Sequence, residues 1–156
     1  MSRREGVAAE GQKQVLMLKR APQLITCPGA WGFVGEHLEP AESWSAAAQR
    51  AAKEELSLKI PESQGINMIP GGSVLVRIPY AGHSDRKDLQ ACGLFMLPLD
   101  EQQIAHIKPD DEVAEMRWMS HHELGQMIER KEGLCNPEIV ELAALFYNLL
   151  CQKGNL

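Results

Sequence analysis

Short apolar runs alternate with polar, turn-forming segments along most of the chain. Four runs combine apolar and β-branched residues over lengths typical of strands: KQVLMLKRA (13–21), SVLVRIPY (73–80), LQACGLFMLPL (89–99) and EVAEMRWMS (112–120). The turn-rich segment AGHSDRKD separates the second run from the third, which predicts a hairpin or two neighbouring strands. CPGAWGF (27–33) predicts a turn that leads into a further extended stretch.

Three other segments have helical character. From Glu42 or Ser43 a capping-type residue precedes an alanine-rich stretch with no glycine or proline before Pro61, which predicts a long helix. HHELGQMIERK (121–131) and NPEIVELAALFYNLLCQK (136–153) place apolar residues at helical spacing, the latter after an Asn cap and a first-turn proline. The sequence shows no internal repeat or linker. It therefore predicts one α/β domain, 14–152, after a flexible N-terminus, 1–13.

Composition narrows the classes of protein that fit this pattern. The 156 residues are 44% hydrophobic, with both charge signs interspersed, which is typical of a globular domain. A net charge of -5 argues against a broad nucleic-acid surface, because such surfaces neutralise phosphates with Lys and Arg. No apolar run approaches the roughly 18 to 20 residues that span a bilayer, and MSRREGVAAEGQ lacks the apolar region of a secretion signal. We therefore expect a cytoplasmic protein that does not bind membranes.

Cysteine and histidine give no metal site. Cys27, Cys92, Cys135 and Cys151 lie far apart without CxxC spacing, so they indicate neither a zinc site nor a disulfide framework. We expect reduced thiols. The histidines His37, His121 and His122 lack a partner at a spacing that defines a metal site.

The most informative stretch is GFVGEHLEPAESWSAAAQRAAKEELSL, residues 32–58. On a helix, Arg50 and Glu54 lie on one face, with Glu55 beside them. Two carboxylates here, with others from the preceding loop, would form a hard-oxygen site suited to Mg²⁺. Any one of these charges alone is more typical of a solvated helix face, so their spacing decides the interpretation.

This stretch resembles the Nudix box, G-x5-E-x7-R-E-U-x-E-E-x-G-U, in which U is a bulky aliphatic residue. Aligned on Arg50, the sequence supplies Glu42, Glu54, Glu55 and Leu58 at matching positions. The spacing of the four acidic and basic residues makes this a specific partial match.

Three positions depart from the box. Glu36 stands where the box has its first glycine, Ala51 replaces the first glutamate of the helical acid set, and Ser57 replaces the closing glycine. Ala52 is a weak substitute for the aliphatic residue. The missing carboxylate at Ala51, which we expect to line an exposed cleft, predicts weakened metal binding.

The resemblance extends beyond the box. VLMLKRA, PGAWGFVGEHLEPAES and DDEVAEMRWMSHHEL resemble the family's strand before the box, its approach to the box, and its later strand and helix start. Together they cover residues 14–124 and imply the Nudix fold, a mixed β-sheet sandwiched between helices. The family usually has one more strand at the front. The first dozen residues hardly provide it, which leaves a fold without that strand as an alternative.

The resemblance also implies a chemistry. In this family the box acids hold Mg²⁺ or Mn²⁺ on a diphosphate, and an activated water attacks phosphorus. Carried over residue by residue, Glu54 and Glu55 become metal ligands, and Arg50 orients the box carboxylates. Glu112, on the later segment, is a candidate for a further ligand or general base, although exposed carboxylates are common there. Glu42 matches too, but a carboxylate at a helix start is favoured by free N–H groups and the helix dipole, so we expect a structural role. The implied substrate is a nucleoside-diphosphate-linked or related small diphosphate.

Two other functions remain open. The departures at Glu36, Ala51 and Ser57 would also suit a Nudix-fold module that binds a ligand without turnover. The isopentenyl-diphosphate isomerase-like branch shares the degenerate box and the PGxW approach, but it needs a catalytic Cys in the loop after the tryptophan. Residues 32–37 after Trp31 contain no thiol, which disfavours isomerisation. The sequence identifies neither the group attached to the diphosphate nor the oligomeric state.

Overall fold

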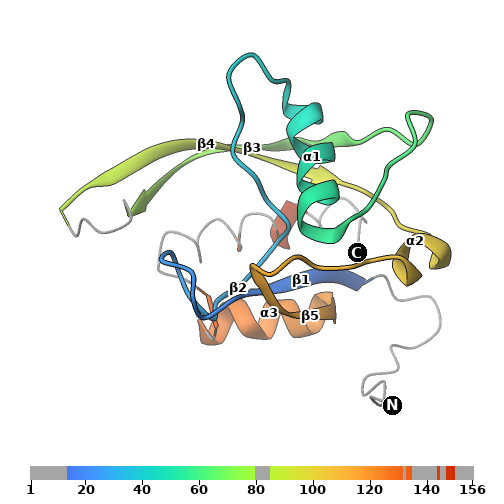
Figure 1. Cartoon of the computed structure of the whole chain (residues 1–156). Helices are drawn as coiled ribbons and strands as arrows, with labels where there is room; N and C mark the ends of the chain where they lie inside the picture. The colour runs from blue at the N-terminus through green and yellow to red at the C-terminus, as the bar shows by residue number, and fades with distance from the viewer. Residues whose placement is uncertain (1–13, 80–84, 132, 135–143, 145–146, 150–156) are drawn as a thin grey trace.

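The computed structural model describes residues 14–79, 85–131, 133–134, 144 and 147–149. Its elements run β1 (Gln14–Arg20), β2 (Trp31–Gly32), α1 (Trp44–Leu56), β3 (Asn67–Pro79), β4 (Lys87–Met96), α2 (Glu101–Ala105), β5 (Val113–Ser120) and α3 (His121–Arg130) (Figure 1). The predicted flexible segment 1–13 lies outside the described residues, as does most of the helix predicted at 136–153. No helix within the described ranges is long and apolar enough to cross a membrane.

The strands form two antiparallel sheets. In the first, β1 lies between β2 and β5, with Leu16 opposite Trp118 and Lys19 opposite Trp31. In the second, β3 and β4 pair as the hairpin that the sequence predicts. The predicted α/β class is confirmed. Every ladder in the described part is antiparallel, so the mixed pairing that the resemblance implied is not seen there.

The β2-β1-β5 sheet separates α1 from α3 (Figure 1). Because successive side chains of a strand point to opposite faces, β1 contributes to a core on each side. Leu18 packs with Leu56 and Leu58 on the α1 side. Met17, which is fully buried, packs with Leu124 of α3 on the other side. This arrangement fixes the position of α1 against the sheet.

The hairpin contacts α1 through Trp44, at the start of the helix. A Cβ atom added to Gly93 of β4 would lie 2.3 Å from Cζ3 of the Trp44 ring, so the ring packs directly on the strand. This close approach supports the view that Trp44 is a packing anchor. The missing side chain of Gly93 is what makes room for it.

Two cysteines fall within the described residues. Cys92 on β4 is a half-buried free thiol, as expected. Cys27 is disulfide-bonded, so the expectation of reduced thiols is wrong for this residue. Widely spaced cysteines could not reveal this pairing, because it depends on how the chain folds back on itself.

Candidate active site

The box helix has well-defined ends. At its start the Ser43 hydroxyl accepts a hydrogen bond from the N–H of Ala46 at 3.1 Å. At its end Ser57 adopts the left-handed conformation, with φ 56° and ψ 25°, and its hydroxyl donates to the carbonyl of Lys108 at 3.0 Å. Glycine is the residue usually found in this conformation at helix ends. Ser57 therefore has the backbone conformation that glycine usually provides at a helix end.

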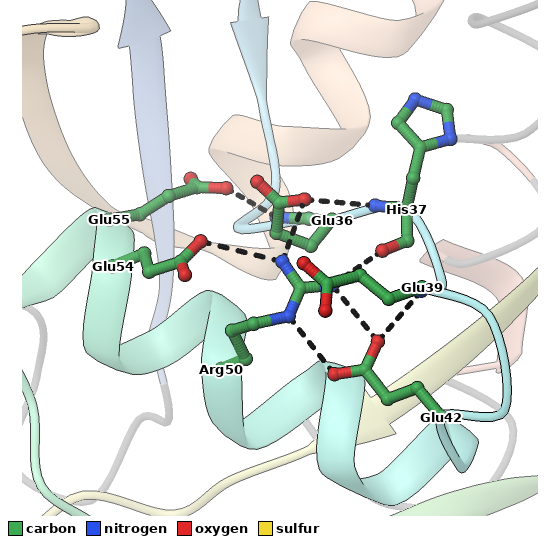
Figure 2. A network of polar contacts seen from close by, with 8 residues as sticks. Glu36, His37, Glu39, Glu42, Arg50, Glu54 and Glu55 are labelled. Atoms are coloured by element: carbon green, nitrogen blue, oxygen red, sulfur yellow. Dashed lines mark hydrogen bonds and ion pairs between the residues drawn. The ribbon is translucent and has the colours of Figure 1, made fainter.

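Arg50 is the centre of the polar network (Figure 2). Its Nε and Nη2 donate to the two carboxylate oxygens of Glu42, each at 3.0 Å. Nη2 also donates to the carbonyl of His37 at 2.6 Å, while Nη1 donates to Glu36 at 3.2 Å and to Glu54 at 3.4 Å. A guanidinium has five N–H groups, so every donor is used. Arg50 thus ties the loop before α1, which carries Glu36 and Glu42, to Glu54 on the helix.

Glu42 has the structural role that we expected, but for a different reason. It precedes the Ser43 cap, and the first turn of α1 contains no acidic residue, so the helix dipole is not what holds it. Its carboxylate instead takes the bidentate bond from Arg50 and accepts the Glu39 N–H at 2.9 Å. These two bonds, the first more than the second, lower the pKa of Glu42. The bond to Glu42 is also the main cause that raises the pKa of Arg50.

Glu55 lies on the side of the helix that faces the loop. Its Oε1 accepts a hydrogen bond from the N–H of Gly35 at 3.2 Å (Figure 2). Burial raises the pKa of Glu55 to about 7, and the charges of Glu36, Asp110 and Glu112 add to this rise, although the Gly35 bond opposes it. A carboxylate with so many acidic neighbours and limited access to water favours the approach of a cation.

The predicted site residues are brought together to different degrees. Arg50 and Glu54 are in direct contact, and Glu55 lies beside them on the next position of the helix. Glu112 is exposed and close enough for its charge to affect Glu55. Ala51 is only 4% exposed, so our expectation that it lines an exposed cleft is wrong.

Two acidic residues near the site were not predicted to take part. Glu36 was treated only as a departure from the box, although an acid in place of a glycine, beside the helix that carries Glu54 and Glu55, was itself a signal. Asp110 acts on Glu55 from the loop before β5, and its own N–H donates to the Glu55 carbonyl at 3.1 Å. No local pattern could show that residues 55 and 110 meet, because they lie on separate segments.

The donor set fits a divalent ion of the Mg²⁺ type. Such ions take hard oxygen ligands and commonly bind through one or two carboxylates, together with water and substrate phosphate. Glu54, whose side chain is 52% exposed, and Glu55 can supply these oxygens. Among the described residues, no three His, Cys, Asp or Glu side chains already form a metal-binding group. Arg50 instead holds two of the carboxylates, Glu36 and Glu54.

The fold and this helix identify the class of protein. The NUDIX domain model matches residues 6–140, so the chain belongs to the Nudix family. The comparison with curated proteins gave no match.

Solved structures share the fold. A MutT protein from Methanosarcina mazei Go1 is similar with a TM-score of 0.59 and 18% identity, over 90% of this chain and 83% of that one. An Ap4A hydrolase from C. elegans gives a TM-score of 0.59 and 19% identity, over 89% of this chain and 87% of that one. DR0079 from Deinococcus radiodurans gives a TM-score of 0.62 and 18% identity, over 86% of this chain and 75% of that one. At such identities the likeness shows the fold alone.

Proposed function

We propose that this protein is a divalent-metal-dependent hydrolase of a nucleoside-diphosphate-linked or related small diphosphate. The observation that carries this proposal is the Arg50 network, in which one guanidinium binds Glu36, Glu42 and Glu54 with every donor used. The network survives although three box positions have changed. Membership of the Nudix family supports the same chemistry. The names of similar structures, which include an Ap4A hydrolase, are in keeping with a phosphoanhydride substrate.

Each residue has a distinct role in this proposal. Glu54 and Glu55 bind Mg²⁺ or Mn²⁺, and Glu112 serves as a further ligand or general base. Arg50 orients the carboxylates, because its planar guanidinium can hold a carboxylate through two parallel hydrogen bonds. When bound, the ion supplies neutralisation of the diphosphate charge and activation of a water. Glu42 holds Arg50 and does not contact the substrate.

The test is a hydrolysis screen with the whole chain. Nucleoside diphosphate sugars, dinucleoside polyphosphates and nucleoside triphosphates are incubated with Mg²⁺ or Mn²⁺, and products are followed by ³¹P NMR. We expect cleavage of at least one class, loss of cleavage in EDTA, and loss in Glu55→Gln. The control Glu62→Gln, an exposed carboxylate beyond the helix, should retain activity. If no substrate is cleaved with either metal, the proposal is wrong.

A second function is favoured by one observation, the absence of a carboxylate at residue 51. With fewer ligands on the helix, the site could bind a diphosphate without cleaving it. Calorimetry separates the two functions. Binding of a diphosphate that remains intact after long incubation with metal would support the binding module, whereas product release would support the hydrolase.

A further inference from the structure

Two of the three departures from the box are complementary. The box has glycine at position 36 and glutamate at position 51, whereas this chain has Glu36 and Ala51. A carboxylate is lost from the helix and another is gained on the loop that faces it. The total number of carboxylates in the box is therefore unchanged. The structure shows whether the gained carboxylate lies where it could act.

Glu36 lies beside both predicted metal ligands. Its Oε2 is 3.2 Å from Arg50 Nη1, and the same nitrogen is 3.4 Å from Oε2 of Glu54. The residue before it, Gly35, donates its N–H to Oε1 of Glu55 at 3.2 Å. Figure 2 shows the Glu36 side chain in the space between Glu55 and Arg50. The side chain is 32% exposed, so a dissolved ion can reach it.

The loop that carries Glu36 is held against the helix on both sides of this residue. The N–H of Gly35 bonds to Glu55, and the carbonyl of His37 accepts from Arg50. The His37 N–H bonds to the Glu36 carboxylate itself at 3.1 Å. These contacts fix the backbone at residue 36, so its side chain starts from a defined point next to the helix.

Ala51 could not take part in the same way without a cost. It lies one helical turn before Glu54 and Glu55, and it is 4% exposed. A glutamate there would bring a charge into a position that is hardly exposed to water, and burial disfavours the charged form. A loop carboxylate that is partly exposed avoids this cost.

We propose that Glu36 replaces residue 51 as the third carboxylate of the metal site, so that Glu36, Glu54 and Glu55 together bind the divalent ion. The proposal rests on the metal-dependent function proposed above. In the structure Arg50 holds Glu36 and Glu54. Metal binding therefore requires Glu36 to exchange this ion pair, whose side chains are 19% and 32% exposed, for the ion.

The experiment measures Mn²⁺ binding without substrate, by calorimetry and by the loss of the free-ion EPR signal. Glu36→Gln keeps the shape of the side chain and its ability to accept from Arg50, but removes the charge. We expect it to weaken Mn²⁺ binding at least about tenfold, a loss of the size seen when metal-supporting residues are removed. The matched control is Glu39→Gln on the same loop, because the bonds of Glu39 to Glu42 are made by its backbone N–H and carbonyl, which the substitution keeps. It should bind Mn²⁺ nearly as the wild type does.

A second variant tests the exchange directly. Glu36→Gly with Ala51→Glu restores the family's arrangement, and it should bind Mn²⁺ more tightly than Glu36→Gly alone. Circular dichroism and urea unfolding check that each variant folds. If the double variant does not fold, Glu36→Gln decides the question.

The outcomes distinguish this inference from the function on which it rests. If the wild type binds Mn²⁺ and Glu36→Gln binds it equally well, Glu36 is not part of the site and the inference alone fails. If the wild type binds no Mn²⁺ in the absence of substrate, this inference fails, because three carboxylates should hold the ion without a substrate phosphate. The proposed function is decided separately by the hydrolysis screen. Weakened binding in Glu36→Gln, with normal binding in Glu39→Gln, supports the inference.

Discussion

Glu55→Gln should change stability and function in opposite directions. The variant should lose metal-dependent hydrolysis, since it removes a charge that a hard ion needs. The metal-free variant should nevertheless be more stable than the wild type at alkaline pH. Burial and the charges of Glu36, Asp110 and Glu112 make the ionised form of Glu55 unfavourable in the fold. Glutamine keeps the acceptor for the Gly35 N–H and has no charge to bury.

The size of this effect follows from the pKa of Glu55, which folding raises from 4.5 to about 7. Between these two values the folded state retains a proton that the unfolded chain has lost, so stability falls as pH rises. Above about 7 the penalty is complete, and below about 4.5 it is absent. Such a rise in pKa corresponds to about 3 kcal/mol for a fully buried group. Partial exposure of the side chain screens the interaction, which leaves about 1 to 2 kcal/mol.

Urea unfolding in EDTA, from about pH 5 to about pH 8, measures this penalty as a difference between wild type and variant. We expect the variant to gain about 1 to 2 kcal/mol at the upper end and almost nothing at the lower end. Glu54→Gln is the matched control on the same helix. Its side chain is 52% exposed, so its stability should stay within about 0.5 kcal/mol of the wild type at every pH. A variant at residue 55 that is less stable than the wild type at about pH 8 would refute the reasoning.

Three further predictions concern the helix and its contacts. Ser57→Gly should be more stable than Ser57→Ala by about 1 kcal/mol. Both variants lose the bond to Lys108, but only glycine adopts φ 56° without strain. Urea unfolding of the two variants would show the order of stability. Gly93→Ala should destabilise the protein by about 1 to 3 kcal/mol, because its Cβ would overlap the Trp44 ring, and the thermal midpoint measures the loss. Arg50→Lys should weaken Mn²⁺ binding in calorimetry although the charge is kept, because an ammonium cannot form the bidentate bond to Glu42. Equal Mn²⁺ affinity in wild type and variant would show that orientation by the guanidinium is unnecessary.

The elements that the sequence predicted well are those whose signal is local. The apolar run in KQVLMLKRA and the alanine-rich run after Ser43 each describe one element, and β1 and α1 appear where these patterns place them. The two long apolar runs pair as β3 and β4, although β3 begins at Asn67, before the predicted run. The short helix α2 was missed, because five residues carry too little periodicity to stand out. Its Asp100 and Gln103 do form a capping box, which was the available signal.

The site was harder to predict, because its charges come from separate segments. The spacing of Arg50 and Glu54 gave their contact directly, since residues four apart on a helix are neighbours. The approach of Gly35 to Glu55 and the influence of Asp110 on Glu55 depend on how the loops cross the helix. Sequence reasoning could not place Ala51 either. Whether a small residue on a helix is covered is decided by the segments that pack over it, and here it is buried.

A Nudix box that departs from the family's sequence motif can still keep the physical properties that the residues of the motif provide. The closing glycine represents a left-handed backbone, which Ser57 adopts with φ 56°. The arginine represents a fork that holds carboxylates, and Arg50 uses all of its donors to do so. The first helical glutamate represents a negative charge beside Glu54 and Glu55. Glu36 brings such a charge from the loop, with its Oε2 3.2 Å from the Arg50 nitrogen that also contacts Glu54. Counting identical residues at the motif positions therefore underestimates how much of the site is retained, because a different residue can supply the same backbone conformation or the same charge.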